Sequence, residues 1–426
     1  MKRIFLIVFL FASIGSFAQP FNNEWINHNL TYYKFKVVTN GLARISLPVL
    51  NNLGIGNVNA DHYQLWRNGQ EIPLFTTTTN GPLTTGGYIE FWGEMNDGKP
   101  DNMLYRQPEW QINDAHNLTS DSSTYFLTIN PAGNNKRLVH TVNDVAGNTL
   151  PKETYFMYTA EHNYKDRIHA GRAELVGTSY TYSSSYDVGE GWTSLDIATG
   201  VTRTIALNGL RPYLGADAPL PSIIVNAAGN AVRTRPFRIR LNNDSIGGAQ
   251  LDYYDLIKYR NTFGPEKLAT GNASIAITNL CPVAGDRMVV AKVGIEYARS
   301  YNFAGLVRFE FSLPANILGN YIELENFPVT GAEIPVLLDL TNGKRYQALG
   351  IAAPLRFKLE PSSVPRRLVV SSTNTLYINQ ITNITPRNFL NFNLPENQGD
   401  YLIISNQLLT SATGDGDPVE EYRAYR

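Results

Sequence analysis

The sequence has little cysteine, little excess of one charge and few long apolar runs. Cys281 is the single cysteine among 426 residues, so no disulfide can form within the chain and its stability must come from packing. The 36 Lys and Arg residues nearly balance the 37 Asp and Glu residues, so we expect neither nucleic acid nor an anionic lipid surface as a partner. After the N-terminus no segment is apolar enough to span a bilayer, and we expect no membrane span in the mature chain.

Sequence motifs for catalysis and metal binding are also missing. The sequence has no Gly-x-Ser-x-Gly elbow and no glycine loop for phosphate, so the hydrolase and nucleotide-binding classes lack their minimum motif. The six histidines include no His-x-x-x-His pair, and only His62 and His162 stand beside an acidic residue, Asp61 and Glu161, so we expect no metal site. Asn96–Asp101 and Gly414–Asp417 carry oxygen atoms suited to calcium, but turn formation explains both clusters with fewer assumptions.

Cys281 is the candidate cysteine nucleophile. It follows the strand-like segment Ala273–Leu280, and no histidine lies near it in the sequence. A thiol needs a neighbouring base or a lowered pKa to act as a nucleophile, whereas a single cysteine more often fills a buried apolar position. We therefore assign no catalytic, cofactor-binding or metal-binding residue, and we expect no cofactor.

The first 18 residues have the pattern of a secretory signal peptide. A basic start, the apolar run Ile4–Phe11 and the small residues Ser16 and Ala18 precede Gln19, which predicts cleavage between Ala18 and Gln19. The apolar run is shorter than the roughly 20 residues of a spanning helix, which disfavours a membrane anchor. We expect an exported protein, and one cysteine in an exported chain of this length favours a bacterial source.

The rest of the chain alternates between apolar and polar residues over short segments, which predicts a mostly β protein with two or more β-sandwich domains of the jelly-roll or Ig-like kind. Asn40-Gly41, Asn68-Gly69 and Asn342-Gly343 lie between such segments and predict hairpins. Leu47–Leu53 is predicted as a short helix with Ser46 as its N-cap. Further predicted strands are 237–241, 288–297, 306–311, 355–359 and 367–371.

Polar, glycine-bearing stretches divide the chain into predicted domains. Near the C-terminus, Tyr401–Ser405 is a short apolar run of the kind buried in a parallel sheet, and Asp417 is placed to cap a helix through Tyr425. We therefore expect the truncated start of an α/β domain there. The predicted limits are 1–18 for the signal peptide, 19–145 for an N-terminal β domain, 146–318 for a β-sandwich, 319–398 for a β-rich connecting domain and 399–426 for the α/β segment.

An aromatic segment is the most distinctive stretch of the sequence. Tyr182, Tyr186, Glu190 and Trp192 place exposed rings beside a carboxylate, which is a candidate sugar-binding surface. Alternating tyrosines are also ordinary strand packing, with Gly189 and Gly191 forming a bend. We favour packing, because the sequence contains no second indication of a sugar site.

Several segments together resemble a known family. They are 87–101 (GYIEFWGEMNDGKPD), 121–127 (DSSTYFL), 187–192 (DVGEGW), 339–342 (DLTN) and 400–404 (DYLII). In this order they are similar to the region upstream of the catalytic domain in gingipain-like cysteine peptidases of Bacteroidetes, a group that includes the sortase of the type IX secretion system.

This resemblance implies a caspase-like catalytic domain that begins near Asp400 and has its His/Cys dyad beyond Arg426. No catalytic residue is therefore carried over to this chain, and Cys281 lies upstream of that domain. The resemblance implies a non-catalytic β portion that supports or shields the downstream domain of the same polypeptide. It also implies an outer-membrane or extracellular location, with secretion-system or cell-surface components as further partners. The alternative is a free-standing surface adhesin or glycan-binding β-sandwich.

The signal peptide gives a direct prediction. Mass analysis of exported protein should find Gln19 at the N-terminus, because Ser16 and Ala18 match the small-residue pattern before a cleavage site. Exported protein that still begins with Met1 would contradict it.

Overall fold

The computed structural model describes residues 23–182, 185–329, 331, 333–410 and 416–426. They form two compact units, of which the larger is Tyr33–Thr385 and the smaller joins the described residues of 1–32 and 386–426. The predicted signal peptide, with cleavage between Ala18 and Gln19, lies outside the described residues. The predicted domain limits at 145, 318 and 398 stay predictions.

The first part of the larger unit is a β-sandwich with an aromatic core. Phe35, Phe91 and Tyr125 are buried in it, and the rings of Phe35 and Tyr125 stack with centroids 5.6 Å apart. One sheet contains, in order, β1 (Tyr32–Val37), β7 (Ser123–Ile129), β3 (Tyr63–Arg67) and β4 (Gln70–Ile72). The other contains β28 (Asn379–Gln380), β2 (Gly41–Ser46), β6 (Tyr88–Gly93) and β5 (Phe75–Thr76).

Two of the three predicted hairpins are present, and one is wrong. Asn68-Gly69 joins β3 to β4 with φ values of 48° and 74°, the positive values that a primed turn requires. Asn342-Gly343 lies between β24 (Val336–Asp339) and β25 (Lys344–Gln347), which pair antiparallel. Asn40-Gly41 instead carries the chain from one sheet to the other. The physical reason is packing, because β1 and β2 both bury apolar side chains in the same core.

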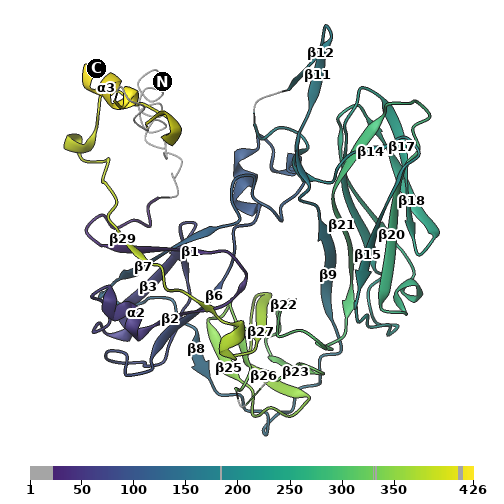
Figure 1. Cartoon of the computed structure of the whole chain (residues 1–426). Coiled ribbons are helices and arrows are strands. Elements are labelled where there is room, and N and C mark those ends of the chain that lie inside the picture. The colour runs from purple at the N-terminus through teal and green to yellow at the C-terminus, as the bar shows by residue number, and fades with distance from the viewer. Residues whose placement is uncertain (1–22, 183–184, 330, 332, 411–415) are drawn as a thin grey trace, which may run out of the picture. The chain divides into compact units, whose positions relative to one another are not determined.

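A second, larger sandwich follows in the chain (Figure 1). Ile223, Val225, Ile239 and Ile277 are fully buried in its core. One sheet contains β14 (Ile197–Ala198), β21 (Arg287–Arg299), β16 (Ser222–Gly229) and β19 (Leu256–Thr262), with β9 (Phe156–Asn163) also paired to β21. The facing sheet contains β15 (Thr202–Asn208), β20 (Asn272–Asn279), β17 (Thr234–Leu241) and β18 (Asp244–Asp252).

The remaining strands of the larger unit form a third core and two small ribbons. The core is rich in phenylalanine and includes Phe156, Phe303, Phe311 and Phe357. Its sheets contain β22 (Arg308–Leu313), β27 (Arg366–Ser371), β24, β25 and β8 (Val139–Thr141), and β23 (Asn320–Leu324) with β26 (Leu355–Leu359). The ribbons are β10 (Arg167–Ala170) with β13 (Glu190–Thr193), and β11 (Ala173–Val176) with β12 (Ser179–Tyr182).

Helices are few and short, as the composition indicated, so the prediction of a mostly β fold is confirmed. The predicted helix near Leu47 is α2 (Leu47–Asn52), which begins after Ser46, although the Ser46 side chain makes no capping hydrogen bond. The 3-10 helices are η1 (Ala60–His62), η2 (Lys99–Leu104), η3 (Pro108–Trp110), η4 (Pro265–Leu268), η5 (Thr375–Tyr377), η6 (Pro395–Asn397) and η7 (Gln407–Leu409).

The smaller unit contains Pro386 and Arg387 of β29 (Thr385–Arg387) and the C-terminal helix α3 (Pro418–Tyr425). Asp417 caps α3 as predicted, since its carboxylate accepts hydrogen bonds from the backbone N–H groups of Val419 and Glu420. The predicted strand Tyr401–Ser405 is not formed, and the side chains of Leu402 and Ile404 are exposed. A strand needs a hydrogen-bonded neighbour, and the described part of the chain pairs none with this segment.

Within the second sandwich, a buried ion pair joins β17 to the turn before β21. The guanidinium of Arg235 donates to both carboxylate oxygens of Asp286, at 2.9 and 3.0 Å, and to the carbonyls of Tyr253 and Ala231. Asn279 donates to the same carboxylate at 2.8 Å. Both charged side chains are 0% exposed, so each depends on the other for its solvation.

Removal of the carboxylate should therefore be costly. We expect Asp286→Ala to lower the free energy of unfolding by about 3–5 kcal/mol, because it leaves the Arg235 charge buried without a partner. Denaturant unfolding of both proteins measures the loss.

The matched control is Asp244→Ala, which breaks an ion pair with Lys267 at the surface. Exposed pairs contribute little to stability, so its unfolding curve should stay close to that of the native protein. Equal losses in the two variants would contradict the role assigned to the buried pair.

Candidate functional site

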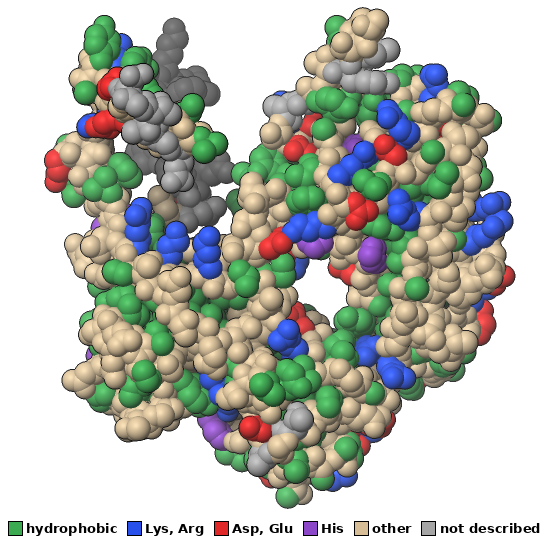
Figure 2. All heavy atoms as spheres, in the orientation of Figure 1, with side chains coloured by type: hydrophobic (Ala, Val, Ile, Leu, Met, Phe, Trp, Pro, Cys, Tyr) green, Lys and Arg blue, Asp and Glu red, His purple; other side chains and the backbone are tan. Residues whose placement is uncertain are grey.

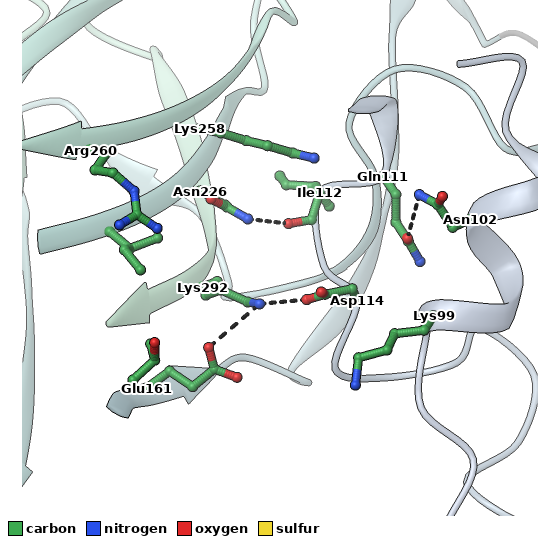
Figure 3. A pocket seen from close by; sticks show the side chains of 12 residues that line it. Lys99, Asn102, Gln111, Ile112, Asp114, Glu161, Asn226, Lys258, Arg260 and Lys292 are labelled. Carbon is green, nitrogen blue, oxygen red and sulfur yellow. Dashed lines mark hydrogen bonds and ion pairs between the residues drawn. The ribbon is translucent and has the colours of Figure 1, made fainter. Parts of the chain in front are cut away.

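A charged cleft lies on the outer face of the second sandwich (Figure 3). Side chains alternate across a β-strand, so Ile223 and Val225 enter the core while Ile224 and Asn226 face outward. The cleft has a volume of about 550 Å³. Its sheet wall consists of Thr159 and Glu161 from β9, Ile224 and Asn226 from β16, Lys258 and Arg260 from β19, and Lys292 from β21.

The opposite wall comes from the segment that contains η2 and η3. It contributes Lys99, Asn102, Gln111, Ile112 and Asp114. Asn226 fixes this wall to the sheet by donating a hydrogen bond of 2.9 Å to the Ile112 carbonyl. The cleft is thus formed by residues far apart in the sequence.

Strand register places three polar side chains of the sheet wall in one row. Asn226 is directly opposite Lys258 on one neighbouring strand and Lys292 on the other. In the next row Ile224 lies between Arg260 and Gly294. The charged groups therefore flank an amide and an aliphatic side chain at the centre of the wall.

Lys292 links the two walls electrostatically. Its ammonium group is 2.5 Å from the Asp114 carboxylate and 3.5 Å from the Glu161 carboxylate. Burial by itself would lower the pKa of Lys292, but the hydrogen bond to Asp114 and the charge of Glu161 outweigh burial and raise that pKa. Burial by itself would raise the pKa of Asp114, but the hydrogen bond to Lys292 and the charge of Lys292 lower that pKa below its ordinary value. Both partners are therefore held in their charged forms.

Lys258 differs from Lys292. Its side chain extends into the cleft (Figure 3), and within the described part of the chain it has no ion pair and no hydrogen bond through its ammonium group. Burial lowers the pKa of Lys258, and nearby Asp114 offsets this only in part. Lys258 is thus a partly desolvated cation without a direct partner.

The other cations of the cleft are already in contact with acidic groups. Arg260 donates from one terminal nitrogen to the Glu296 carboxylate and to the Ser222 hydroxyl. Lys99 lies 3.1 Å from the Asp97 carboxylate and is largely exposed. On the face shown in Figure 2, positive and negative side chains are interspersed, so the charge of the cleft is a local feature.

The arrangement is suited to binding an anion. The lining has four cations, Lys99, Lys258, Arg260 and Lys292, and two carboxylates, Asp114 and Glu161. Because Asp97 and Glu296 pair with Lys99 and Arg260 from outside the lining, Lys258 is the lining cation without an ion pair among the described residues. Among the described residues that line the cleft there is no serine, cysteine or histidine, so the lining lacks the usual nucleophile and base pair.

Three of the four residues predicted for the aromatic site, Tyr186, Glu190 and Trp192, make contacts within the protein. Glu190 stabilises a turn, and Tyr186 and Trp192 contact the loop that contains Tyr105 and Asn117. The Glu190 carboxylate accepts hydrogen bonds from the backbone N–H groups of Tyr186 and Asp187. Burial raises the pKa of Glu190. The Tyr186 ring meets the Tyr105 ring edge to face at 5.4 Å. Trp192 donates from its indole nitrogen to the Asn117 carbonyl at 2.9 Å.

Tyr182, the fourth residue, lies apart on the β11–β12 ribbon. Its side chain is 46% exposed, and it lines a separate hollow with Arg172 and Glu174. The predicted bend is present, since Gly189 and Gly191 have φ values of 77° and 149°. The contacts of this segment are those of packing, and a sugar-binding role stays a prediction.

Cys281 has the environment of a core residue. It is 2% exposed, its Sγ atom lies 3.7 Å from the Thr234 carbonyl, and its backbone N–H donates to Asn279. His162 packs edge to face against Tyr164, and His169 contacts the Gly189 carbonyl. No hydrogen bond in the described part of the chain joins a histidine to the thiol.

The two acidic clusters also have structural partners. Asp101 is buried and accepts hydrogen bonds from Asn117 and from the backbone N–H of Leu118. Gly414 and Asp415 lie outside the described residues. Within the described residues no group of three or more His, Cys, Asp or Glu residues is placed to hold a metal ion. No helix among those residues has both the length and the apolarity needed to cross a membrane.

One wall of the cleft has a recognisable pattern in the sequence. Lys258 and Arg260 alternate with Ile257 and Tyr259, a pattern typical of a strand with one wet face. The pairing that brings Lys292 and Asp114 to the same place depends on tertiary contacts, which the alternation does not encode.

Comparisons with known proteins give a fold and no family. No family model matches the sequence, and no curated protein matches it. The dimeric latent PorU of Porphyromonas gingivalis is similar in structure, with a TM-score of 0.51 and 9% identity over 83% of this chain. A family 35 carbohydrate-binding module from Clostridium thermocellum matches 32% of this chain and 97% of its own at a TM-score of 0.20 and 15% identity. This chain covers 33% of the PorU chain, and at such identity the similarity shows a shared fold alone.

Proposed function

We propose that this chain is the non-catalytic β portion of an exported gingipain-like cysteine peptidase or type IX secretion sortase. In this proposal it supports or shields a His/Cys catalytic domain of the same polypeptide, at the outer-membrane surface or outside the cell. The observation that carries the proposal is the structural similarity to PorU over 83% of the chain. It coincides with the family to which five sequence segments point.

Those sequence segments have structural roles that fit a supporting function. Glu90, from the first segment, is 0% exposed and binds Arg44 at 2.7 Å and Arg345 at 3.0 Å. Asp339, from the fourth, lies 3.4 Å from Arg366, and both side chains are 1% exposed. Buried charges require such partners. Asp339 therefore acts within one sheet, since β24 pairs with β27, and Glu90 also joins its sheet to the sheet of Arg345.

The C-terminal residues support the proposed partner. In the smaller unit Leu402, Ile404 and Leu408 are each more than 80% exposed. A cluster of exposed apolar side chains is typical of a surface that another protein part covers. In the proposed protein these residues belong to the start of the catalytic domain, and the rest of that domain covers them.

The adhesin alternative has less support. The lining of the charged cleft includes no aromatic side chain among its described residues, whereas sugar rings usually stack on aromatic groups. Trp192 and Tyr186 are engaged in contacts with Asn117 and Tyr105. The sequencing of the complete gene separates the two functions, since the proposed one requires a downstream domain with histidine and cysteine.

The purified chain should have no peptidase activity, and Cys281→Ser should change neither activity nor export. Cys281 is buried, and in the described structure its thiol contacts the Thr234 carbonyl and no histidine, so it lacks the base that would activate it. Serine at this site leaves a hydroxyl in a position shaped for a thiol, at a cost of about 1–3 kcal/mol if it finds no partner. Cleavage of a mixed peptide library and melting curves of both proteins test these expectations.

Circular dichroism of the serine variant serves as the control for folding. Turnover by the native chain that disappears in a folded Cys281→Ser protein would refute the non-catalytic function. A melting temperature that drops by several degrees with no turnover in either protein agrees with it.

A further inference from the structure

We propose that the charged cleft binds an acidic peptide segment, with carboxylate groups of that peptide paired to Lys258 and Arg260. The starting observation is Lys258, whose ammonium group lies in the cleft without an ion pair or hydrogen bond in the described part of the chain. The proposal rests on the geometry of the cleft and is independent of the function proposed above.

The charges of the cleft leave positive charge available. Both carboxylates of the lining, Asp114 and Glu161, are bound to Lys292. Arg260 uses one terminal nitrogen for Glu296 and Ser222, and its other two guanidinium nitrogens donate no hydrogen bond in the described structure. A carboxylate can accept two parallel hydrogen bonds from a guanidinium group. Lys258 and Arg260 come from one strand, two residues apart, and therefore face the same side.

The Lys258 residue is exposed, but its side chain lines the cleft, and this position gives an energetic reason for an anionic partner. A lysine that is partly removed from water loses hydration of its charged form, which is why its pKa is lowered. A bound carboxylate would replace the lost hydration with a direct charge interaction. An ion pair inside a cleft is screened less by salt than one at an open surface.

The uncharged groups of the cleft favour a peptide. The Asn102 side-chain oxygen and the Thr159 hydroxyl take part in no hydrogen bond of the described structure, and both line the cleft. They are available to pair with the amide groups of a peptide backbone. The lining has no aromatic ring among its described residues, which leaves an acidic sugar without the stacking surface that such ligands use. A volume of about 550 Å³ is within the range of ligand sites in proteins.

The test uses the full chain and fluorescent hexaglutamate, with binding followed by anisotropy at low salt. Lys258→Gln should weaken binding by roughly tenfold, the effect of one lost hydrogen bond between charged groups. Lys258→Glu should abolish hexaglutamate binding, because it places a like charge at the same position. Added salt should weaken binding by the native chain.

The matched control is Lys267→Gln, which removes one positive charge from the same sandwich. Lys267 pairs with Asp244 and does not line the cleft. This variant should bind hexaglutamate as the native chain does. Melting curves establish that each variant is folded.

Three results would overturn the proposal. They are no binding of hexaglutamate by the native chain, equal weakening by Lys258→Gln and Lys267→Gln, and tighter binding of oligogalacturonate or inorganic phosphate than of hexaglutamate. The last result would assign the cleft to a sugar acid or a free anion, and the second would indicate attraction to the general surface. None of them bears on the presence of a downstream catalytic domain.

Discussion

The side-chain amide of Asn113 is the interaction on which the cleft depends. It is 2% exposed, and its nitrogen lies 3.2 Å from the Tyr164 carbonyl, 3.1 Å from the Trp192 carbonyl and 3.3 Å from the Ala291 carbonyl. The Tyr164 and Ala291 carbonyls belong to the second sandwich and the Trp192 carbonyl to the β10–β13 ribbon, and a buried carbonyl without a donor is costly. The Asn113 amide therefore donates hydrogen bonds to backbone carbonyls of these strands. The same bonds hold its own loop, from the first part of the chain, against the sheet. Without that loop the outer face of the sheet would be an open surface.

A chain with one cysteine needs another means of specifying which sheets meet. Two buried carboxylates, of Glu90 and Asp286, are each bound by an arginine from a strand of a different sheet. Glu90 in β6 binds Arg345 in β25, so it connects the first sandwich to the sheet that contains β24 and β27. Such pairs add little net stability, but separating them leaves a buried charge alone. We interpret them as selecting one arrangement of sheets over alternatives that apolar packing would tolerate equally.

The sequence was informative where local chemistry decides the structure. Asn68-Gly69 forms its turn because both residues adopt positive φ, and 355–359 forms β26 because its alternation agrees with burial on one side. Prediction failed where tertiary partners decide. Asn40-Gly41 has the same dipeptide, yet the strands beside it join different sheets to bury side chains in a shared core. The cleft was missed for the same reason, since Lys292 and Asp114 meet only through the docking of a distant loop.

The aromatic segment and the cleft have one scaffold in common, and this changes the meaning of the segment. The loop that contributes Gln111 and Ile112 to the second wall of the cleft also contains Tyr105 and Asn117. The Tyr105 hydroxyl donates to the Glu190 carbonyl at 2.9 Å, and the Asn117 carbonyl accepts from Trp192. Glu190 and Trp192 therefore hold the loop through residues that do not line the cleft. The residues that resemble a sugar platform in the sequence thus contribute to the shape of a neighbouring cleft, because they fix the loop that forms its second wall.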